Sequence, residues 1–181
     1  MNTIRWSAIG FTVVRVLLAV ALYGFAALFM GLALVPAVWL CYAVWQGTAD
    51  QMFLWRLVWV CLTAGASYFV FGFSLMFLAA LFRWMFRLDL KEGEYPLASL
   101  GMLRWYCANA VQLLVGTIFV DFLLMTPFAA LFSRLMGARL GLNVQINSKC
   151  CADLSLLDIG DNAVIGGHAT VVAHSFESRG L

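Results

Sequence analysis

Two long apolar runs near the start of the chain limit most strongly what it can fold into. Val16 to Trp45 contains 30 residues without a charge, and Met52 to Phe82 contains 31 residues whose only charge is Arg56. About 20 apolar residues suffice for a helix to cross the ~30 Å hydrocarbon core of a bilayer. The runs therefore predict a transmembrane helical hairpin over residues 1–82, with four shorter spans as the open alternative.

The composition agrees with a membrane as the solvent of this region. The chain is 64% hydrophobic and 11% charged, whereas a soluble domain averages about 25% charged residues. A soluble protein could not bury so much apolar surface, so membrane lipid is the expected partner. The net charge of +2 is small and the basic residues are scattered, which argues against nucleic acid as a partner.

The charges beside the apolar runs predict how the hairpin is oriented. Arg5 and Arg15 precede or begin the first run, Arg83 and Arg87 follow the second, and the polar turn between them holds Asp50 and no base. Lysine and arginine are retained on the cytoplasmic side of membranes. We therefore expect a multi-pass protein of the cell (inner) membrane, with both flanks of the hairpin and the C-terminal region in the cytoplasm.

The middle of the chain divides into a polar and an apolar part. Residues 83–106 predict a charged cytoplasmic connector, and residues 107–136 a third apolar segment interrupted by Gly116, Asp121 and Pro127. A single crossing would place the C-terminal region outside the cell. A re-entrant or interfacial helical segment is preferred, because Arg134 and Arg139 follow the apolar stretch Cys107–Phe132 closely. Asp121 is expected to be a paired polar group at a bend, since an aspartate in a membrane normally faces protein or water.

A six-residue beat begins where the apolar segments end. Each six-residue unit opens on an aliphatic residue; these are Leu140, Ile146, Ile159, Ile165 and Val171. Ile146 and Ile159 are 13 residues apart, so one extra residue is inserted within two units. Hexapeptide periodicity is typical of a parallel β-helix, in which each short strand turns one aliphatic side chain inward. The beat predicts such a fold over residues 137–181, with an irregular tail as the alternative. Asp153, Asp158 and Asp161 are expected at turns.

Four stretches carry a family resemblance: KEGEYPLASLGMLRWY (91–106), GARLGLNVQIN (137–147), DLSLLDIGDNAVIGGHATVVAH (153–174) and HSFESRGL (174–181). They resemble the left-handed β-helix acyltransferases of the hexapeptide-repeat family. The closest likeness is to the membrane-linked, acetyltransferase-like C-terminal modules of poly-lysine-synthase-type peptide synthetases. The resemblance implies a partial left-handed β-helix over 137–181, acetyl-CoA or a carrier-bound acyl thioester as co-substrate, and a hydroxyl or amine acceptor. It also implies a homotrimer and a carrier protein or synthetase module as partner.

The candidate catalytic residues lie at the end of the beat. Histidine is the natural proton acceptor near neutral pH, and the resemblance places one at His174. Glu177 or Asp158 is expected to orient its ring, as the third group of a triad does. His168 lies six residues earlier and so on another face of the expected β-helix, where it is poorly placed to share a metal with His174. No metal site is expected, and the five cysteines show no zinc-binding spacing.

The number of coils leaves the function open. Residues 140–181 supply little more than two coils of about 18 residues, and at least three repeats are normally needed for stability. We therefore expect either part of a longer acyltransferase or a non-catalytic membrane anchor that assembles with a partner. A small transporter is the third hypothesis, suggested by Asp121 and Arg56 within apolar runs. It is disfavoured because the sequence has no inverted repeat and too few spans to enclose a path.

Overall fold

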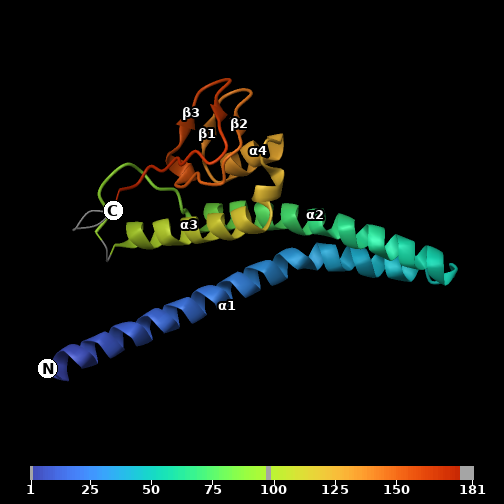
Figure 1. The fold of residues 1–181 in the computed structure, drawn as a ribbon, viewed down its shortest axis with the longest axis horizontal. Coiled ribbons are helices and arrows are strands. Elements are labelled where there is room, and N and C mark those ends of the chain that lie inside the picture. The colour runs from blue at the N-terminus through green and yellow to red at the C-terminus, as the bar shows by residue number, and fades with distance from the viewer. Residues whose placement is uncertain (1, 97–98, 176–181) are drawn as a thin grey trace. The chain divides into compact units, whose positions relative to one another are not determined.

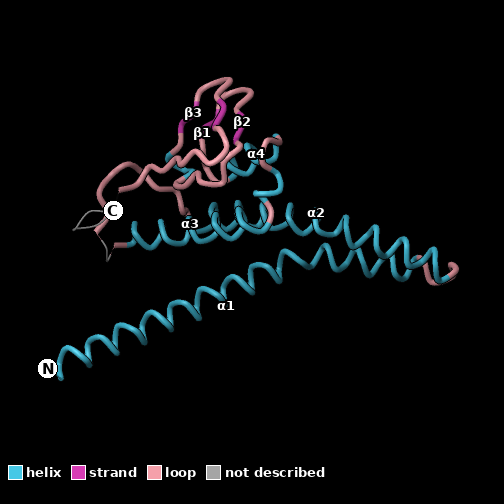
Figure 2. Tube along the Cα trace, in the orientation of Figure 1, coloured by secondary structure: helices cyan, strands magenta, loops and turns pink. Residues whose placement is uncertain are grey.

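The computed structural model describes residues 2–96 and 99–175, and the side chains of residues 2–12, 14, 15 and 18 lie outside this description. The described part is mostly helical, with short strands toward its C-terminal end (Figure 2). It divides into two compact units, Met1–Ser67 and Tyr68–Leu181. Each unit is considered by itself below.

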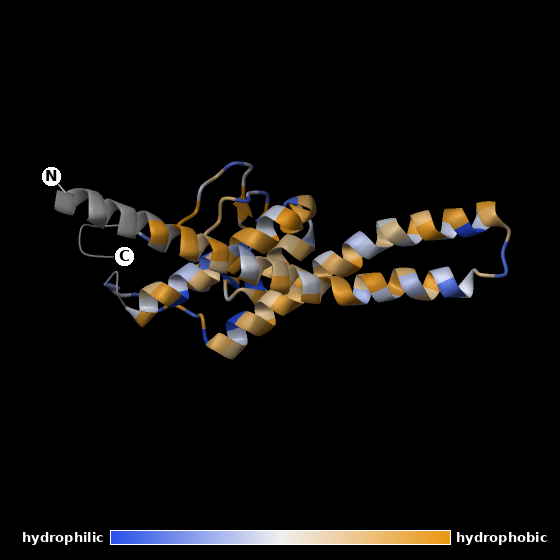
Figure 3. Cartoon of the chain, turned by 90° about the horizontal axis from the view of Figure 1, so that it is seen from below, coloured by the Kyte–Doolittle hydropathy of each residue, from blue (hydrophilic) through white to orange (hydrophobic). Residues whose placement is uncertain are grey.

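The first unit is formed by two helices joined by a short polar turn. Helix α1 spans Asn2–Gly47 and continues through Pro36, and helix α2 spans Phe53–Phe86, of which the first half belongs to this unit. Two segments, Ala19–Gly47 and Phe53–Phe86, are long and apolar enough to cross a membrane. Hydrophobic residues occur along both helices, and hydrophilic residues form the turn between them (Figure 3). Each apolar run of the sequence is therefore one continuous helix.

Small and polar side chains hold these two helices together. Ala33 and Ala37 of α1 are buried, and small residues allow helix backbones to approach closely. The Ser67 hydroxyl donates to the carbonyl of Ala37 at 3.2 Å and lies 3.1 Å from Cys41 Sγ. Hydrogen bonds of this kind contribute on the order of 1 kcal/mol between membrane helices.

Arg56 occupies the end of the hairpin beside the turn. Its guanidinium donates to the carbonyl of Trp45 at 3.3 Å and lies 3.6 Å from the centre of the Trp45 ring. A cation stacked on an indole is stabilised by the ring's negative face. This contact suits a helix end at a membrane interface, because tryptophan is enriched there.

The second unit begins with the second half of α2 and continues into a group of helices. Helix α3 spans Leu100–Ile118, the short helix η1 spans Val120–Leu123, and helix α4 spans Pro127–Leu135. Ser99 and Thr126 accept hydrogen bonds from backbone N–H groups at the starts of α3 and α4, as N-cap residues do.

Phe119, between α3 and η1, joins these helices to α2. Its side chain is fully buried, and its ring packs edge-on against the rings of Tyr68, Phe69 and Phe73. The Tyr68 hydroxyl donates to the carbonyl of Ile118 at 2.9 Å. These contacts fix the end of α3 and η1 against α2 at the level of Tyr68.

Four short strands follow the helices and pair in parallel. Strands β1 (Arg139–Leu140) and β3 (Asp158–Ile159) form one pair, and β2 (Gln145–Ile146) and β4 (Val164–Ile165) form the other. A third parallel contact joins Cys151 to Val171. The strands lie on one side of α3 (Figure 1).

The pairing register follows the six-residue beat of the sequence. Leu140 lies opposite Ile159, and Ile146 lies opposite Ile165, so the aliphatic residues that open the units stack on one another. Each partner follows nineteen residues later, which matches three hexapeptides with the one extra residue noted between 146 and 159. The four strands thus pair in the predicted region and in the register of the repeat, whereas Cys151 and Val171 pair at an offset of twenty residues.

Candidate functional site

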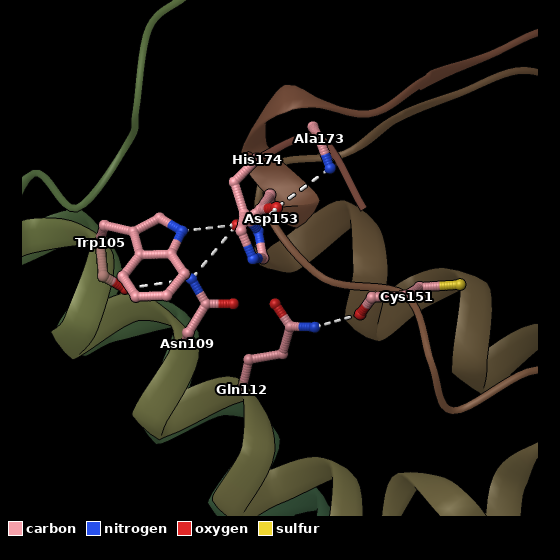
Figure 4. Close-up of polar contacts among 7 residues, drawn as sticks. All are labelled: Trp105, Asn109, Gln112, Cys151, Asp153, Ala173 and His174. Atoms are coloured by element: carbon pink, nitrogen blue, oxygen red, sulfur yellow. Dashed lines mark hydrogen bonds and ion pairs between the residues drawn. The ribbon is translucent and has the colours of Figure 1, made fainter. Parts of the chain in front are cut away.

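One face of α3 carries three polar side chains toward the strand layer. Trp105, Asn109 and Gln112 are spaced by four and three residues, which places them on the same side of a helix. Gln112 donates through its amide to the carbonyl of Cys151, and the Asn109 amide donates to the carbonyl of Trp105 at 3.1 Å. The face therefore meets the segment around Asp153 with hydrogen-bond donors (Figure 4).

Asp153 is the centre of this cluster. Its Oδ1 accepts hydrogen bonds from Trp105 Nε1 at 2.7 Å and from Asn109 Nδ2 at 3.3 Å. Its Oδ2 accepts from the Ala173 backbone N–H at 3.1 Å and contacts His174 Nδ1 at 2.5 Å. Each carboxylate oxygen thus accepts two hydrogen bonds. The donors to Oδ1 come from α3, and those to Oδ2 come from Ala173 and His174.

The burial of Asp153 makes its charge state informative. Its side chain has no exposed surface, and burial by itself would raise the pKa of the carboxyl. The hydrogen bonds from His174, Trp105, Ala173 and Asn109 act in the opposite direction and hold the pKa of Asp153 below its usual value. Asp153 is therefore ionised at neutral pH and accepts every bond it makes.

The backbone of Asp153 is also unusual. It has a left-handed conformation, with φ 54° and ψ 43°, immediately before the short helix η2 (Leu154–Leu156). Non-glycine residues adopt this conformation uncommonly, and such positions cluster at functional sites. The conformation turns the side chain of Asp153 back toward α3 and His174 (Figure 4).

The contact with Asp153 fixes the state of the His174 ring. An ionised carboxylate can only accept, so His174 Nδ1 must carry the proton in this pair. In the neutral imidazole the basic lone pair is then on Nε2. The ring of Trp105 packs edge-on against the imidazole, with 5.0 Å between the ring centres. One carboxylate and one indole thus set both the tautomer and the orientation of a histidine that is 22% exposed.

A small hydrophobic cluster supports the indole from its other side. Leu90 and Met102 are buried with Trp105, and Tyr95 and Leu156 pack against them. The Tyr95 hydroxyl donates to the carbonyl of Lys91 at 2.7 Å, which closes the turn that follows Leu90. The segment expected to be a charged connector therefore has an apolar inner side that covers the site.

The residues expected to assist His174 have different surroundings. Asp158 is exposed and forms an ion pair with Arg139 at 3.3 Å, and Glu177 lies outside the described residues. Asp153, expected at a turn, is the carboxylate that contacts His174. His168 is exposed, with φ 63°, and no group of three or more potential metal ligands occurs among the described residues.

Three residues of the cluster carried little signal in the sequence. Trp105 ends the expected charged connector and looks like an interfacial tryptophan, and Asn109 looks like an ordinary residue of the apolar segment that follows. The partner that both find is Asp153, which is 48 and 44 residues away. Asp153 follows the Cys150–Cys151 pair outside the six-residue beat. The useful signal was the spacing of Trp105, Asn109 and Gln112, which places polar groups on one face of an otherwise apolar helix.

A cleft of about 600 Å³ adjoins the cluster. Its walls come from α3, η1, α4 and the segment between β2 and η2. Asn109 belongs both to this cleft and to the hydrogen-bond network of Asp153. Asp121 and Lys149, the charged residues of the lining, form an ion pair at 3.5 Å, as expected for a paired aspartate at a bend.

Comparison with family models, with curated proteins and with solved structures finds no match for this chain.

Proposed function

We propose that the chain is a membrane-embedded acyltransferase that moves an acyl or aminoacyl group from a thioester donor to a hydroxyl or amine. His174 is the general base, and Asp153 is the carboxylate that positions it. The observation that carries the proposal is the 2.5 Å contact between His174 Nδ1 and a fully buried, ionised carboxylate. A histidine held in this way is the activated base of many acyl-transfer sites.

The chemistry requires little else from the chain. His174 Nε2 removes the proton from the acceptor as its oxygen or nitrogen attacks the thioester carbonyl. The new C–O or C–N bond forms, the C–S bond breaks, and the proton passes from the imidazolium to the leaving thiolate. Asp153 stabilises the imidazolium between these two steps, because its negative charge lies against Nδ1.

The strand layer supports the fold that the proposal needs. Aliphatic residues opposite one another at a nineteen-residue offset are what successive coils of a β-helix with one inserted residue would give. Together with the family resemblance, this register favours a left-handed β-helix. Acetyl-CoA or a carrier-bound thioester as the donor, a homotrimer, and the cytoplasmic side of the inner membrane are further parts of the proposal, because thioester donors are cytoplasmic.

The proposal is tested by following acyl transfer in membranes that contain the full chain. Labelled acetyl-CoA is supplied, and label in lipid, peptide and small amine fractions is measured. The His174→Ala variant is expected to lose about 10²–10⁴-fold in rate, the usual contribution of a general base. Added imidazole should restore part of the activity of this variant, because it can enter the vacated position and accept the proton.

Two further variants separate the roles of the carboxylates. Asp153→Asn should lower kcat strongly, because an amide cannot hold the proton on His174 Nδ1 in the same way. Asp158→Asn should retain activity, since Asp158 pairs with Arg139 at the surface. Full activity of His174→Ala would remove the base role. If the unmodified chain transfers no acyl group to any fraction, a non-catalytic anchor or assembly subunit becomes the better explanation.

A further inference from the structure

The cleft beside the Asp153–His174 pair has a mostly apolar lining. Its walls include two facing sets of residues, one from the helices and one from the strand layer: Leu113, Gly116, Phe132, Ile146, Leu154 and Val172. Its volume of about 600 Å³ lies within the roughly 300–1,000 Å³ range of ligand sites. It is large enough to hold an extended group of many atoms rather than a few waters.

The cleft adjoins the hydrogen-bond network of the proposed catalytic pair through Asn109. Ala152 and Leu154, on either side of Asp153, line it, and Asn109 joins its wall to the carboxylate. Val172, two residues before His174, lines it from the strand layer. A molecule that fills the cleft therefore lies beside the Asn109–Asp153 hydrogen bond of the network that holds His174.

The charges of the cleft indicate which chemistry fits it. Asp121 and Lys149 pair with each other at 3.5 Å, and both side chains are partly exposed. Their charges cancel, so the cleft offers no net charge to a ligand. The part of a ligand that lies inside is therefore uncharged and apolar.

Gly116 keeps the cleft open. It lies on the α3 wall, and a Cβ placed on it would meet no atom within 4 Å. A glycine within a helix costs roughly 0.5–1 kcal/mol relative to alanine, and at this position the missing side chain leaves space in the cleft. A larger residue here would project into that space without displacing the backbone.

The surroundings of η1 indicate where the ligand comes from. Phe122 and Met125 are 65% and 70% exposed, and exposed apolar groups of this size mark contact with a partner or a membrane. The same region packs on Tyr68 and Phe69, which lie within the apolar segment Phe53–Phe86 that is long enough to cross a membrane. This end of the cleft thus lies beside a membrane-spanning candidate, where hydrocarbon is the available ligand.

We propose that the cleft holds a hydrocarbon chain of a membrane lipid, and that the acyl acceptor is a lipid with a hydroxyl or amine near His174. This inference rests on the proposed function for the acceptor role, whereas lipid binding stands on the cleft itself. In the reaction the lipid hydroxyl or amine loses its proton to His174 Nε2 and gains the acyl group. The thiol leaves with the proton, so the lipid becomes an ester or amide.

The experiment uses the full chain in nanodiscs that contain phosphatidylethanolamine and a phospholipid with a diazirine on its acyl chain. After illumination, mass spectrometry locates the crosslinked residues. Crosslinks are expected on α3 and on the segment around Lys149. The Gly116→Phe variant should reduce them about tenfold, since the added ring occupies the cleft. Gly65→Phe is the matched control, because Gly65 also faces open space but does not line the cleft.

Two more variants distinguish a loss of lipid binding from a loss of catalysis. Val172→Phe narrows the cleft from the opposite wall and should also reduce crosslinking, which distinguishes blockage from a fault in α3. His174→Ala should leave crosslinking unchanged while it lowers the rate of transfer about 10²–10⁴-fold. Crosslinking to cleft residues without transfer would retain the lipid site and reject the proposed function.

Other results would overturn the lipid site. Equal crosslinking of the unmodified chain and the Gly116→Phe variant would do so, as would the absence of lipid crosslinks from the residues that line the cleft. Transfer to a water-soluble amine that is unaffected by Gly116→Phe would reject the lipid acceptor alone.

Discussion

Asp153 is the residue on which most of the site depends, and its replacement by asparagine tests this. Both carboxylate oxygens accept two donors, so an amide at this position meets donors with its own N–H₂ group in either orientation. Leaving buried polar groups unsatisfied costs about 1–3 kcal/mol each. We expect Asp153→Asn to lower the thermal unfolding temperature in detergent clearly.

Asp158→Asn is the matched control for this change. The Asp158–Arg139 pair is exposed on both sides, and exposed ion pairs are worth at most about 1 kcal/mol. This variant should unfold within a few degrees of the unmodified chain. Equal destabilisation by the two substitutions would mean that the network around Asp153 contributes nothing special.

The lowered pKa of Asp153 gives a pH dependence with a defined sign. A carboxyl whose pKa is lower in the folded state stabilises the fold above its unfolded value of 3.8. This contribution is lost as the pH falls through the lower, folded-state pKa. The free energy of unfolding should therefore fall more steeply in the unmodified chain than in Asp153→Asn below about pH 4. A stability difference that stays constant down to about pH 2 would contradict the lowered pKa.

Cys150 and Cys151 should differ in reactivity although they are adjacent. Cys150 is exposed, whereas Cys151 is buried. Burial, and secondarily the neighbouring Cys150, raises the pKa of the Cys151 thiol. Since the thiolate is the reactive form, N-ethylmaleimide at neutral pH should modify Cys150 first. Peptide mapping checks this, with the denatured chain as the control in which both react; faster labelling of Cys151 would contradict its burial.

The sequence was informative about some of these residues and silent about others. His174 could be singled out because it lies in the last hexapeptide unit and because the sequence there resembles a family that has a histidine at that place. Asp153 could not be paired with it, because that contact spans 21 residues and Asp153 lies at a turn with a left-handed backbone conformation. Local sequence patterns indicate where the chain turns, whereas long-range packing determines which groups a side chain at such a turn contacts.

At the scale of elements, Gly72 sets the approach of α2 to the end of α3. A Cβ at this position would lie 2.1 Å from Phe119 Cδ2, and Phe119 is fully buried and cannot move away. Overpacking of this kind costs about 1–3 kcal/mol. Gly72→Ala should therefore lower the stability of the chain, measured by unfolding in detergent.

Gly65→Ala in the same helix is the control for Gly72. A Cβ at Gly65 meets nothing within 4 Å, so alanine there should be neutral or stabilise by up to about 1 kcal/mol, since it favours helix over glycine. If both substitutions behave alike, the contact between Gly72 and Phe119 does not determine the packing.

Gly141 has a similar role between neighbouring strand segments. An added Cβ would lie 2.2 Å from Asp161 Oδ1 and 2.6 Å from the Asp161 backbone nitrogen. The same carboxylate accepts from the Leu142 N–H at 2.6 Å, so Gly141→Ala should break this bond and speed amide exchange in β1 and β3. Gly160→Ala, which meets nothing within 4 Å, should leave exchange unchanged. Unchanged exchange in Gly141→Ala would reject the close approach.

The elements differ in how far local sequence determines them. The two apolar runs and the strand register were predictable, because hydrophobic length and a six-residue period are local signals. The helices α3 and α4 were harder, since Gly116, Asp121 and Pro127 looked like interruptions of one apolar segment. The helical part of α3 runs through Gly116, and the chain turns only at η1, where Phe119 meets α2.

At the scale of the whole molecule, the sequence predicts an orientation that a labelling experiment can test. Helix α2 is 34 residues long and carries a polar turn at one end and Arg83 near the other. A helix of this length exceeds the ~30 Å hydrocarbon core, so a crossing would place its ends on opposite sides of the membrane. The positive-inside rule assigns the end with Arg83 to the cytoplasm.

Single cysteines at the two ends of α2 report this orientation. Both variants are made in a chain whose five native cysteines have been replaced, and the cells are first stripped of any wall or outer membrane. Asp50→Cys, in the turn, should then react with a membrane-impermeant maleimide while the inner membrane is intact. Gly93→Cys should react only after the membrane is permeabilised. Labelling of both from outside would mean that α2 does not cross. The reverse pattern would place His174 away from cytoplasmic thioesters and so remove the donor on which the proposed reaction depends.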